Sequence, residues 1–263
     1  MSKRLTPTIL RFDSLPSTNT EAARQAALGA PEGLCILARE QTAGRGRRER
    51  GWVSPKDAGL YLSVVLRPSF DARSWPLITL AAALAVRDAL GETCGLEADI
   101  KWPNDLLAGG RKLCGILAET ADSARGRAVV LGVGVNLLRG SFPPEINDAA
   151  TSVEEQTGRA PDAEQLLEAL TRALASFYET LHEPDGPARI LREWESHSSY
   201  AHGRRVRVAL AEETFEGTTR GLEPDGALLV ETDEGTTRTV RAGDVTSVRE
   251  QNRGRDLAAI RQE

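Results

Sequence analysis

Residues 99–137 read DIKWPNDLLAGGRKLCGILAETADSARGRAVVLGVGVNL, and they carry the main signal for the topology of this chain. Three short apolar segments alternate here with turn residues: 100–102, which Pro103 ends, then 113–119, then 129–137. Apolar runs of this length, bounded by Gly, Pro, Asn or Asp, are typical of β-strands. The stretch is therefore predicted to form a strand, a hairpin and a strand.

The segments before this stretch alternate between helix and strand patterns. Thr18 and Glu21 fit a capping box at the start of a helix over about 19–28. Residues 73–91 carry an Ala/Leu-rich helical pattern that is expected to stop at Gly91. Strands are predicted at 10–12, 34–38 and 60–67. This alternation indicates a mixed α/β domain.

Two helices and a change of composition follow. An amphipathic helix is predicted after Pro161, because apolar residues recur at helical spacing over 166–181, and a second helix is predicted over about 187–197. From Gly203 onward, short runs rich in Thr, Val, Glu and Gly alternate with turns, which predicts a small β-barrel or sandwich. We therefore expect a large domain over 1–200, a small β-domain over 203–250 and a tail over 251–263.

The composition excludes several classes of protein. The 263 residues are 40% hydrophobic and 27% charged with a net charge of −5, so disorder and nucleic-acid binding over the whole surface are both disfavoured. The most apolar stretch, 77–86, is too short to cross a membrane, and no signal peptide is recognisable. The three cysteines form no CxxC motif. We expect a cytoplasmic protein with no membrane contact.

The loop Gly44-Arg45-Gly46-Arg47-Arg48-Glu49-Arg50-Gly51-Trp52 concentrates positive charge in an acidic protein. Arginines that repel one another do not stabilise a fold, and glycines allow the backbone to approach a ligand closely. A loop that closes on carboxylate and phosphate is one interpretation; a solvated basic loop and an RNA-binding patch are the alternatives. The chain has neither a P-loop nor a G-x-G-x-x-G motif.

A second cluster combines Lys101, Asn104 and Asp105 with Lys112. Lys101 lies inside an apolar strand and needs a partner, for which Asp105 is the obvious candidate. Simple ion pairing would explain the cluster. Alternatively, Lys101 and Lys112 lie on adjacent strands of one hairpin and converge on a polyanion, while Asp105 and Asn104 supply oxygens suited to Mg²⁺.

Two weaker signals complete the set. Gly132-Val133-Gly134-Val135-Asn136 leaves room above a strand and ends in a polar side chain, and Ser17-Thr18-Asn19 is either a helix cap or a set of ligand contacts. The three histidines show no ligand spacing, and no Ser-His-Asp or Cys-His arrangement is recognisable. Nucleophilic catalysis by the chain itself is therefore not indicated.

In this order and spacing, the motifs closely resemble those of the biotin protein ligase family. The resemblance covers roughly residues 9–250. It rests on Ser17-Thr18-Asn19, Gln41-Thr42-Ala43-Gly44-Arg45-Gly46-Arg47-Arg48, Gly59-Leu60-Tyr61-Leu62-Ser63, Lys101-Trp102-Pro103-Asn104-Asp105-Leu106, Arg111-Lys112-Leu113-Cys114-Gly115-Ile116-Leu117 and Gly132-Val133-Gly134-Val135-Asn136.

The resemblance implies an α/β (α+β) fold: a mixed-sheet catalytic domain like that of class II aminoacyl-tRNA synthetases, with a small C-terminal SH3-like β-barrel. It implies an enzyme that uses ATP, Mg²⁺ and biotin to form biotinyl-5′-AMP. The biotinyl group then passes to one lysine of a biotin carboxyl carrier protein, such as a subunit of acetyl-CoA carboxylase.

The resemblance also assigns roles to residues. Catalytic positions are Lys101, Lys112 and Arg47, and Asp105 is the expected Mg²⁺ contact. The biotin side comprises Ser17, Thr18, Asn19, Gln41, Gly44, Arg45, Gly46, Arg47, Lys112, Gly115 and Gly132. The ATP side comprises Arg47, Arg48, Arg50, Trp52, Lys101, Asn104, Asp105 and Asn136.

The sequence departs from the family pattern in two places. Glu49 occupies the place of a glycine in the usual family loop, and the catalytic resemblance starts within about ten residues of Met1, so no DNA-binding domain and no repressor activity are expected. A homodimer is our expectation for the assembly.

Two other functions are alternatives to a biotin protein ligase. The first is a ligase or transferase for lipoate or octanoate, although Ser17, Thr18 and Gln41 favour a ureido ring. An RNA-binding protein is the second.

Overall fold

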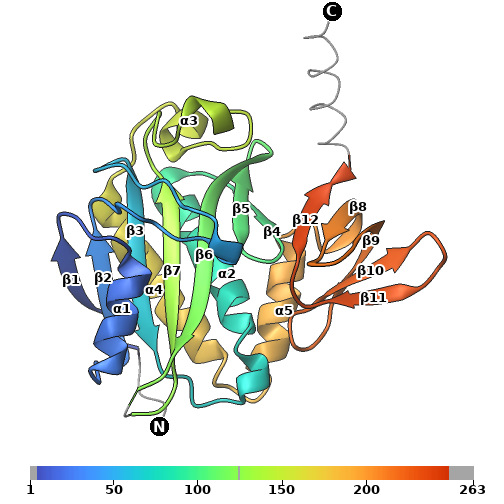
Figure 1. Cartoon of the computed structure of the whole chain (residues 1–263), viewed down its shortest axis with the longest axis horizontal. Coiled ribbons are helices and arrows are strands. Elements are labelled where there is room, and N and C mark those ends of the chain that lie inside the picture. Colours follow the sequence, from blue (N-terminus) through green and yellow to red (C-terminus); the bar gives the residue numbers. More distant parts are fainter. Residues whose placement is uncertain (1–4, 124, 249–263) are drawn as a thin grey trace, which may run out of the picture.

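The computed structural model describes residues 5–123 and 125–248 (Figure 1). The tail expected over 251–263 therefore lies outside the described residues, as do 249 and 250 of the expected β-domain. No helix of the described ranges is both long enough and apolar enough to cross a bilayer.

A seven-stranded mixed sheet forms the centre of the larger part, in the order β1-β2-β3-β7-β6-β5-β4. β1 and β2 are parallel, and all other neighbours in this sheet are antiparallel. β3 is buried along nearly its whole length, which is why its sequence is almost continuously apolar. The strands are β1 (Thr8–Phe12), β2 (Leu34–Ala38), β3 (Gly59–Leu66), β4 (Asp99–Lys101), β5 (Asp105–Ala108), β6 (Arg111–Ala121) and β7 (Ala128–Asn136).

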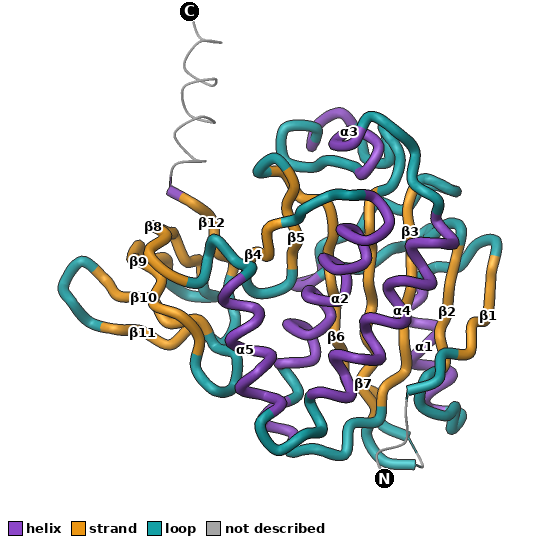
Figure 2. Tube along the Cα trace, turned by 180° about the vertical axis from the view of Figure 1, so that it is seen from behind, coloured by secondary structure: helices purple, strands orange, loops and turns teal. Residues whose placement is uncertain are grey.

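Helices cover both faces of this sheet (Figures 1 and 2). α1 (Thr18–Ala27) packs through Ala22 and Ala26 against β2, β3 and β7. α2 (Leu77–Cys94), α4 (Ala163–Thr180) and α5 (Gly186–Ser196) pack on the other face, where α2 contacts α4, α5 and the strands β4, β5 and β6. α2 is apolar on nearly all sides because it is buried, whereas α4 shows the predicted amphipathic pattern. The short helix α3 (Val153–Thr157) lies beyond one end of the strands.

A second, five-stranded antiparallel sheet has the order β11-β10-β9-β8-β12. Its strands are β8 (His202–Ala209), β9 (Thr214–Leu222), β10 (Leu228–Thr232), β11 (Thr237–Val240) and β12 (Asp244–Ser247). The predicted class is confirmed: a mixed α/β part is followed by a small antiparallel β part.

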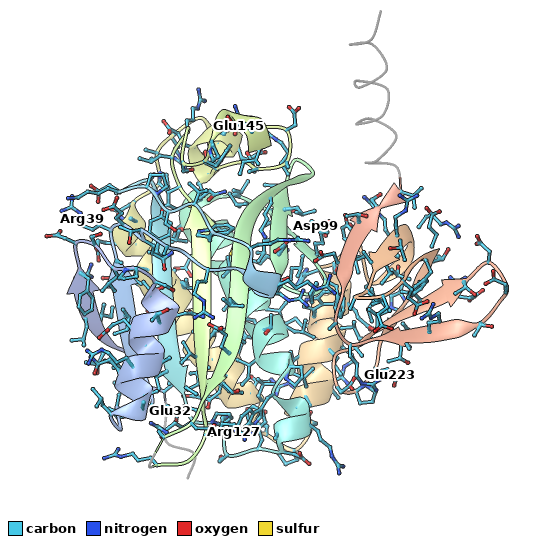
Figure 3. The ribbon with its side chains drawn as sticks, in the orientation of Figure 1. Glu32, Arg39, Asp99, Arg127, Glu145 and Glu223 are labelled. Atoms are coloured by element: carbon cyan, nitrogen blue, oxygen red, sulfur yellow. The ribbon has the colours of Figure 1, made fainter. Side chains whose placement is uncertain are left out.

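Several contacts join the two parts. Trp102 Nε1 donates to Gly226 O at 3.0 Å, and a Cβ on Gly226 would lie only 3.0 Å from Leu77 and 3.2 Å from Leu80 of α2. Figure 3 shows Asp99 at this boundary, where its carboxylate accepts hydrogen bonds from the backbone N–H and the hydroxyl of Ser199 at 2.8 and 2.6 Å. The second sheet is therefore fixed against α2 and β4.

Three local predictions were wrong. Ser17, not Thr18, caps α1, because its side chain accepts from Thr20 N. α2 continues through Gly91 and ends at Cys94, and Gly95 caps it in the left-handed conformation that favours glycine (φ 62°). Finally, 99–137 forms four strands rather than three, because 105–108 forms β5, which pairs with both β4 and β6.

Candidate active site

A pocket lies where the glycine-arginine loop (residues 44–52) covers β6 and β7, beside the N-terminus of α1 and the start of β12. We call it the loop pocket. Its lining residues are Ser17, Thr18, Asn19, Gln41, Arg45, Gly46, Arg47, Arg50, Gly51, Trp52, Asn104, Asp105, Lys112, Gly115, Ile116, Leu117, Gly132, Val133, Gly134 and Asp244.

A buried network of amides and hydroxyls forms one wall of the loop pocket. Gln41 Oε1 accepts from Thr18 N at 2.8 Å and from the Thr18 hydroxyl at 3.0 Å, while Gln41 Nε2 donates to Ser54 Oγ at 2.8 Å. Thr18 and Ser54 are each only 4% exposed. These groups can give and accept hydrogen bonds without carrying charge, which suits a neutral polar head group.

The loop folds back on itself, and its glycines are needed for this. Gly46 N donates to Arg50 O at 2.7 Å, and Trp52 N donates to Gly44 O at 2.9 Å. A Cβ on Gly44 would lie 2.3 Å from Trp52 O, so no larger residue fits there without a shift. Arg48, at the bend, has a left-handed φ of 54°.

Trp52 lies over a glycine pair in the sheet. Gly115 of β6 and Gly134 of β7 face each other in register. A Cβ on Gly134 would lie 2.6 Å from Trp52 Nε1, and one on Gly115 would lie 3.0 Å from the Trp52 ring. The two glycines therefore make room for the indole. Trp52 Nε1 is buried and has no hydrogen-bond partner among the described residues, which leaves a donor available inside the pocket.

Lys112 and Asp105 form an ion pair at the other side of the pocket. Lys112 Nζ lies 2.7 Å from Asp105 Oδ1 and 5.4 Å from the centre of the Trp52 ring. The same Asp105 oxygen is buried without a directed hydrogen bond. We interpret the contact between Lys112 and Asp105 as an ion pair whose geometry does not suit a hydrogen bond. The Asp105 carboxylate can therefore bind a further cation.

Three arginines join the loop to the second sheet. Arg47 Nη1 donates to Asn104 Oδ1 at 3.2 Å and to Gly243 O at 3.4 Å. Arg48 Nη1 lies 3.4 Å from Asp244 Oδ2, and Arg50 Nη2 pairs with the same oxygen. Asp244 begins β12, so the second sheet supplies a carboxylate to the pocket.

Burial lowers the pKa of the Arg47 guanidinium below its ordinary value; Asp244 and Asp105 act in the opposite direction, and Arg48 and Arg50 in the same one. A guanidinium nevertheless keeps its charge at neutral pH. Arg47 is thus a cation that has lost much of its water, which strengthens its attraction for an anion entering the pocket.

Most of the predicted site residues line the loop pocket, but four do not: Gly44, Arg48, Lys101 and Asn136. Lys101 and Lys112 are not on adjacent strands, because β5 separates β4 from β6. The partner predicted for Lys101 was also wrong. Asp105 pairs with Lys112, while Lys101 Nζ lies 5.7 Å from the centre of the Tyr200 ring.

Asn136 is buried behind the pocket, where its amide donates to Thr151 O at 3.0 Å. The space above Gly132 is filled by Asn19, since a Cβ there would lie 2.2 Å from Asn19 Oδ1. The loop arginines Arg45, Arg48 and Arg50 are exposed, but carboxylates and carbonyl groups hold them in place.

Sequence reasoning missed six lining residues: Gly51, Ile116, Leu117, Val133, Gly134 and Asp244. Gly134 and the apolar members lie within the quoted motifs, so alternation along β6 and β7 could have found them. Asp244 has no such signal, because a single aspartate near a turn of the second sheet is an ordinary surface residue.

The cysteine thiols are poor candidates for nucleophiles. Burial raises the pKa of Cys35 to about 12, and burial also raises the pKa of Cys114, which lies on the pocket-lining strand β6. Both thiols are therefore protonated at neutral pH. Among residues 5–123 and 125–248, no group of three or more His, Cys, Asp or Glu is placed to hold a metal ion.

Sequence profiles of two known families match this chain. Residues 11–136 match the biotin/lipoate A/B protein ligase family, and residues 201–246 match the biotin protein ligase C-terminal domain. The first match contains all the predicted site residues, and the second contains Asp244. The two matches define the class to which the fold and the pocket correspond: protein ligases for biotin or lipoate.

Curated relatives and a solved structure narrow this class. The biotin–[acetyl-CoA-carboxylase] ligase of Paracoccus denitrificans is 39% identical over 220 residues, which span 81% of this chain and 90% of the relative. The enzyme of the same name from Mycobacterium tuberculosis is 36% identical over 239 residues, 89% of this chain and 86% of the relative. The biotin protein ligase from Aquifex aeolicus in complex with biotin and ATP superimposes with a TM-score of 0.79 at 28% identity, covering 92% of this chain and 98% of that one. This chain belongs to the biotin protein ligase family.

Proposed function

We propose that this protein is a biotin–[biotin carboxyl carrier protein] ligase that activates biotin with ATP and transfers it to a lysine of an acetyl-CoA carboxylase subunit or a similar carrier. One observation carries the proposal. A neutral hydrogen-bonding wall formed by Thr18 and Gln41 shares a single pocket with Lys112 and the loop arginines. Biotin combines the matching features: a neutral ureido head and a carboxylate tail.

The first step joins two anions, and the chain supplies the cations for it. The biotin carboxylate oxygen attacks the α-phosphorus of ATP, the bond to the β-phosphate oxygen breaks, and pyrophosphate leaves. Lys112 and Arg47 reduce the repulsion between carboxylate and triphosphate and stabilise the charge that develops on the phosphoryl oxygens. The Trp52 N–H is a further donor that an oxygen of the substrate can use.

The second step needs no nucleophile from the enzyme. The neutral amine of the carrier lysine attacks the activated carbonyl carbon, an amide forms, AMP leaves, and the amine loses its proton. The mixed anhydride is open to hydrolysis until then, so a loop that excludes water protects it. The arginines that hold the loop against β12 serve this purpose.

Mg²⁺ fits the pocket as a companion of the triphosphate. The described residues offer no cage for a metal, but Asp105 has a buried oxygen without a directed hydrogen bond, and one carboxylate together with phosphate oxygens is a usual Mg²⁺ environment. Asp105 would hold the ion, which would neutralise phosphate charge.

Biotin-dependent exchange between ATP and pyrophosphate, with lipoate assayed in parallel, tests the proposal. Exchange with biotin alone, followed by labelling of a purified carrier, is the expected result. Exchange with lipoate alone would change the substrate and overturn the proposal as stated. Absence of exchange with both, from folded protein, would overturn it entirely. Light scattering of the same preparation tests the expected homodimer.

A further inference from the structure

Glu119, on β6, lies between the glycine-arginine loop and the polar wall of the pocket. Its Oε1 pairs with Nη2 of Arg45, and its Oε2 accepts from Asn19 Nδ2 at 2.9 Å. The side chain is 32% exposed, so the pair is partly protected from water. Each carboxylate oxygen thus has its own donor, one from the loop and one from α1.

Asn19 connects this carboxylate to the residues expected to recognise the head group. Asn19 Oδ1 lies 2.6 Å from the Ser63 hydroxyl, which also lies 2.8 Å from Thr18 Oγ1. The Ser63 proton can serve only one of these acceptors. When Ser63 donates to Asn19, the Thr18 hydroxyl can donate to Ser63. The backbone N–H of Thr18 still donates to Gln41 Oε1 at 2.8 Å. A continuous set of hydrogen bonds therefore runs from Gln41 to Glu119.

The surrounding groups leave Asn19 little freedom. It is 4% exposed, it fills the space above Gly132, and its Nδ2 also donates to Leu117 O at 3.3 Å. With its Nδ2 on Glu119 and its Oδ1 on Ser63, the amide has one orientation that satisfies both neighbours. The position of Glu119 is thereby tied to the polar wall.

We propose that Glu119 is a positioning residue that holds the glycine-arginine loop closed over the biotin end of the pocket. This inference rests on the proposed function. A head group bound to Thr18 and Gln41 orders the network, the network fixes Glu119, and Glu119 holds Arg45 in place. Closure of the loop and occupancy of the head-group site then favour each other.

Glu119→Gln tests this proposal, because it removes the charge and keeps the shape. Glu164→Gln is the matched control: Glu164 forms a two-bond pair with Arg11 at 2.7 Å for each bond, away from the loop pocket. Limited trypsin digestion of the ligand-free protein reports the loop directly, since trypsin cleaves after arginine. We expect cleavage after Arg45 to become several-fold faster in Glu119→Gln, in line with the loss of a charge-assisted hydrogen bond, and to stay unchanged in the control.

Steady-state exchange kinetics supply the second measurement. Because Arg45 is assigned to the biotin side alone and Arg48 and Arg50 to the ATP side alone, we expect the KM for biotin to rise by up to about fivefold in Glu119→Gln. The KM for ATP should stay within about twofold of wild type. A purely structural role would lower the melting temperature and the amount of active enzyme without separating the two KM values.

The outcomes separate the inference from the proposed function. Wild-type protein that shows no ATP–pyrophosphate exchange would overturn the proposed function. The comparison of trypsin cleavage between wild type and Glu119→Gln would still test the link between Glu119 and the loop. Active wild-type protein with unchanged cleavage and unchanged KM for biotin in Glu119→Gln would overturn the inference alone. An equal rise in both KM values would also overturn it.

Discussion

At Lys112, one ammonium group has two neighbours inside the pocket. It pairs with Asp105, and it lies beside the face of Trp52. These contacts replace part of the water that surrounds a free ammonium. A substrate carboxylate can approach the same ammonium without displacing Asp105, because an ammonium has three donors.

Lys112→Ala should lower biotin-dependent pyrophosphate exchange by about a hundredfold or more, as expected for the loss of a charge that stabilises the transition state. The protein should stay folded with a lower melting temperature, because Asp105 Oδ1 is buried and loses its ion-pair partner, although the carboxylate as a whole keeps partial contact with water. Thermal melting and exchange assays on the same sample check both statements. Lys56→Ala, an exposed lysine outside the pocket lining, is the control. A folded Lys112→Ala protein with normal exchange would contradict the assignment.

Single residues differed in how well the sequence predicted them. Several charged and polar residues lie close together in the sequence around Lys112, around Gln41 and in the glycine-arginine loop. A shared pocket could therefore be expected for these segments. Glu119 and Asp244 could not be predicted, because each is a single acidic residue with no neighbouring charged residue that would mark it as part of a site. Their importance comes from the arginines that tertiary folding brings next to them.

At the scale of elements, α2 tolerates a glycine where the sequence suggested an end. Gly91 is exposed, and a Cβ at this position would meet no atom within 4 Å. Buried apolar contacts on both sides of Gly91 keep the helix intact, which local propensity could not reveal. Helix length here is decided by packing on the sheet rather than by the sequence of one turn.

Gly91→Ala should therefore stabilise the protein by about 0.4–1 kcal/mol, because alanine favours the helix and restricts the unfolded chain. Urea denaturation measures the change. A loss of stability would show that the space above Gly91 is not available.

A glycine-to-alanine substitution in the glycine pair of β6 and β7 should have a different effect from Gly91→Ala. Gly134→Ala places a methyl group 2.6 Å from Trp52 Nε1, so the indole has to move out of the pocket. Because Trp52 belongs to the expected ATP side, we expect a rise in the KM for ATP of about tenfold or more, equivalent to at least roughly 1.4 kcal/mol, with a smaller effect on stability. Quenching of tryptophan fluorescence by acrylamide should report a more exposed indole. Unchanged kinetics would place the substrate away from Trp52.

The strand pattern shows the same limit of sequence reasoning. Most strands of the large sheet were predicted within one or two residues, because their apolar runs are bounded by clear turn residues. β5 was missed, since the four residues of Asp105–Ala108 are too short to show a period, and its pairing on both sides defines it as a strand. The error also misplaced Lys101 relative to Lys112.

At the scale of the whole molecule, ion pairs are spread over the surface. Figure 3 shows Arg39 at one edge, where it contacts both Asp57 and Asp13. Hydrogen bonds from Arg39 lower the pKa of Asp57, those from Arg111 lower the pKa of Glu155, and those from Arg207 lower the pKa of Glu216. Arginines paired in this way are less available to nucleic acid, which disfavours the RNA-binding alternative.

The directions of these pKa shifts determine whether the protein gains or loses stability as the pH falls. A carboxyl group whose pKa is lower in the folded state stabilises the protein above its unfolded pKa of about 4, and this contribution disappears as the pH falls through the folded value. The melting temperature should thus be nearly constant near neutral pH and should decrease below about pH 4. Scanning calorimetry from neutral pH to strongly acidic buffer checks this. A melting temperature that rises on acidification would contradict it.

Asp244 connects the two parts of the molecule through the loop arginines. Asp244→Asn should raise the KM for ATP about three- to fivefold, because Arg48 and Arg50 lose the carboxylate that holds them at the end of the pocket where we propose that phosphate binds. The KM for biotin should change less. Asp233→Asn, which removes a carboxylate paired with Arg205 elsewhere on the same sheet, is the control. Equal kinetics in both variants would argue against the role of Asp244.

The position of Asp244 also has a consequence for biosynthesis. β12 is the last strand of the described chain, so the ribosome makes the loop, the sheet and the helices before it makes Asp244. A nascent chain can fold its larger part first, as domains generally do during translation. Its pocket then lacks the carboxylate of Asp244 until β12 has been made. Activity should accordingly appear late in synthesis, well after most of the chain has left the ribosome.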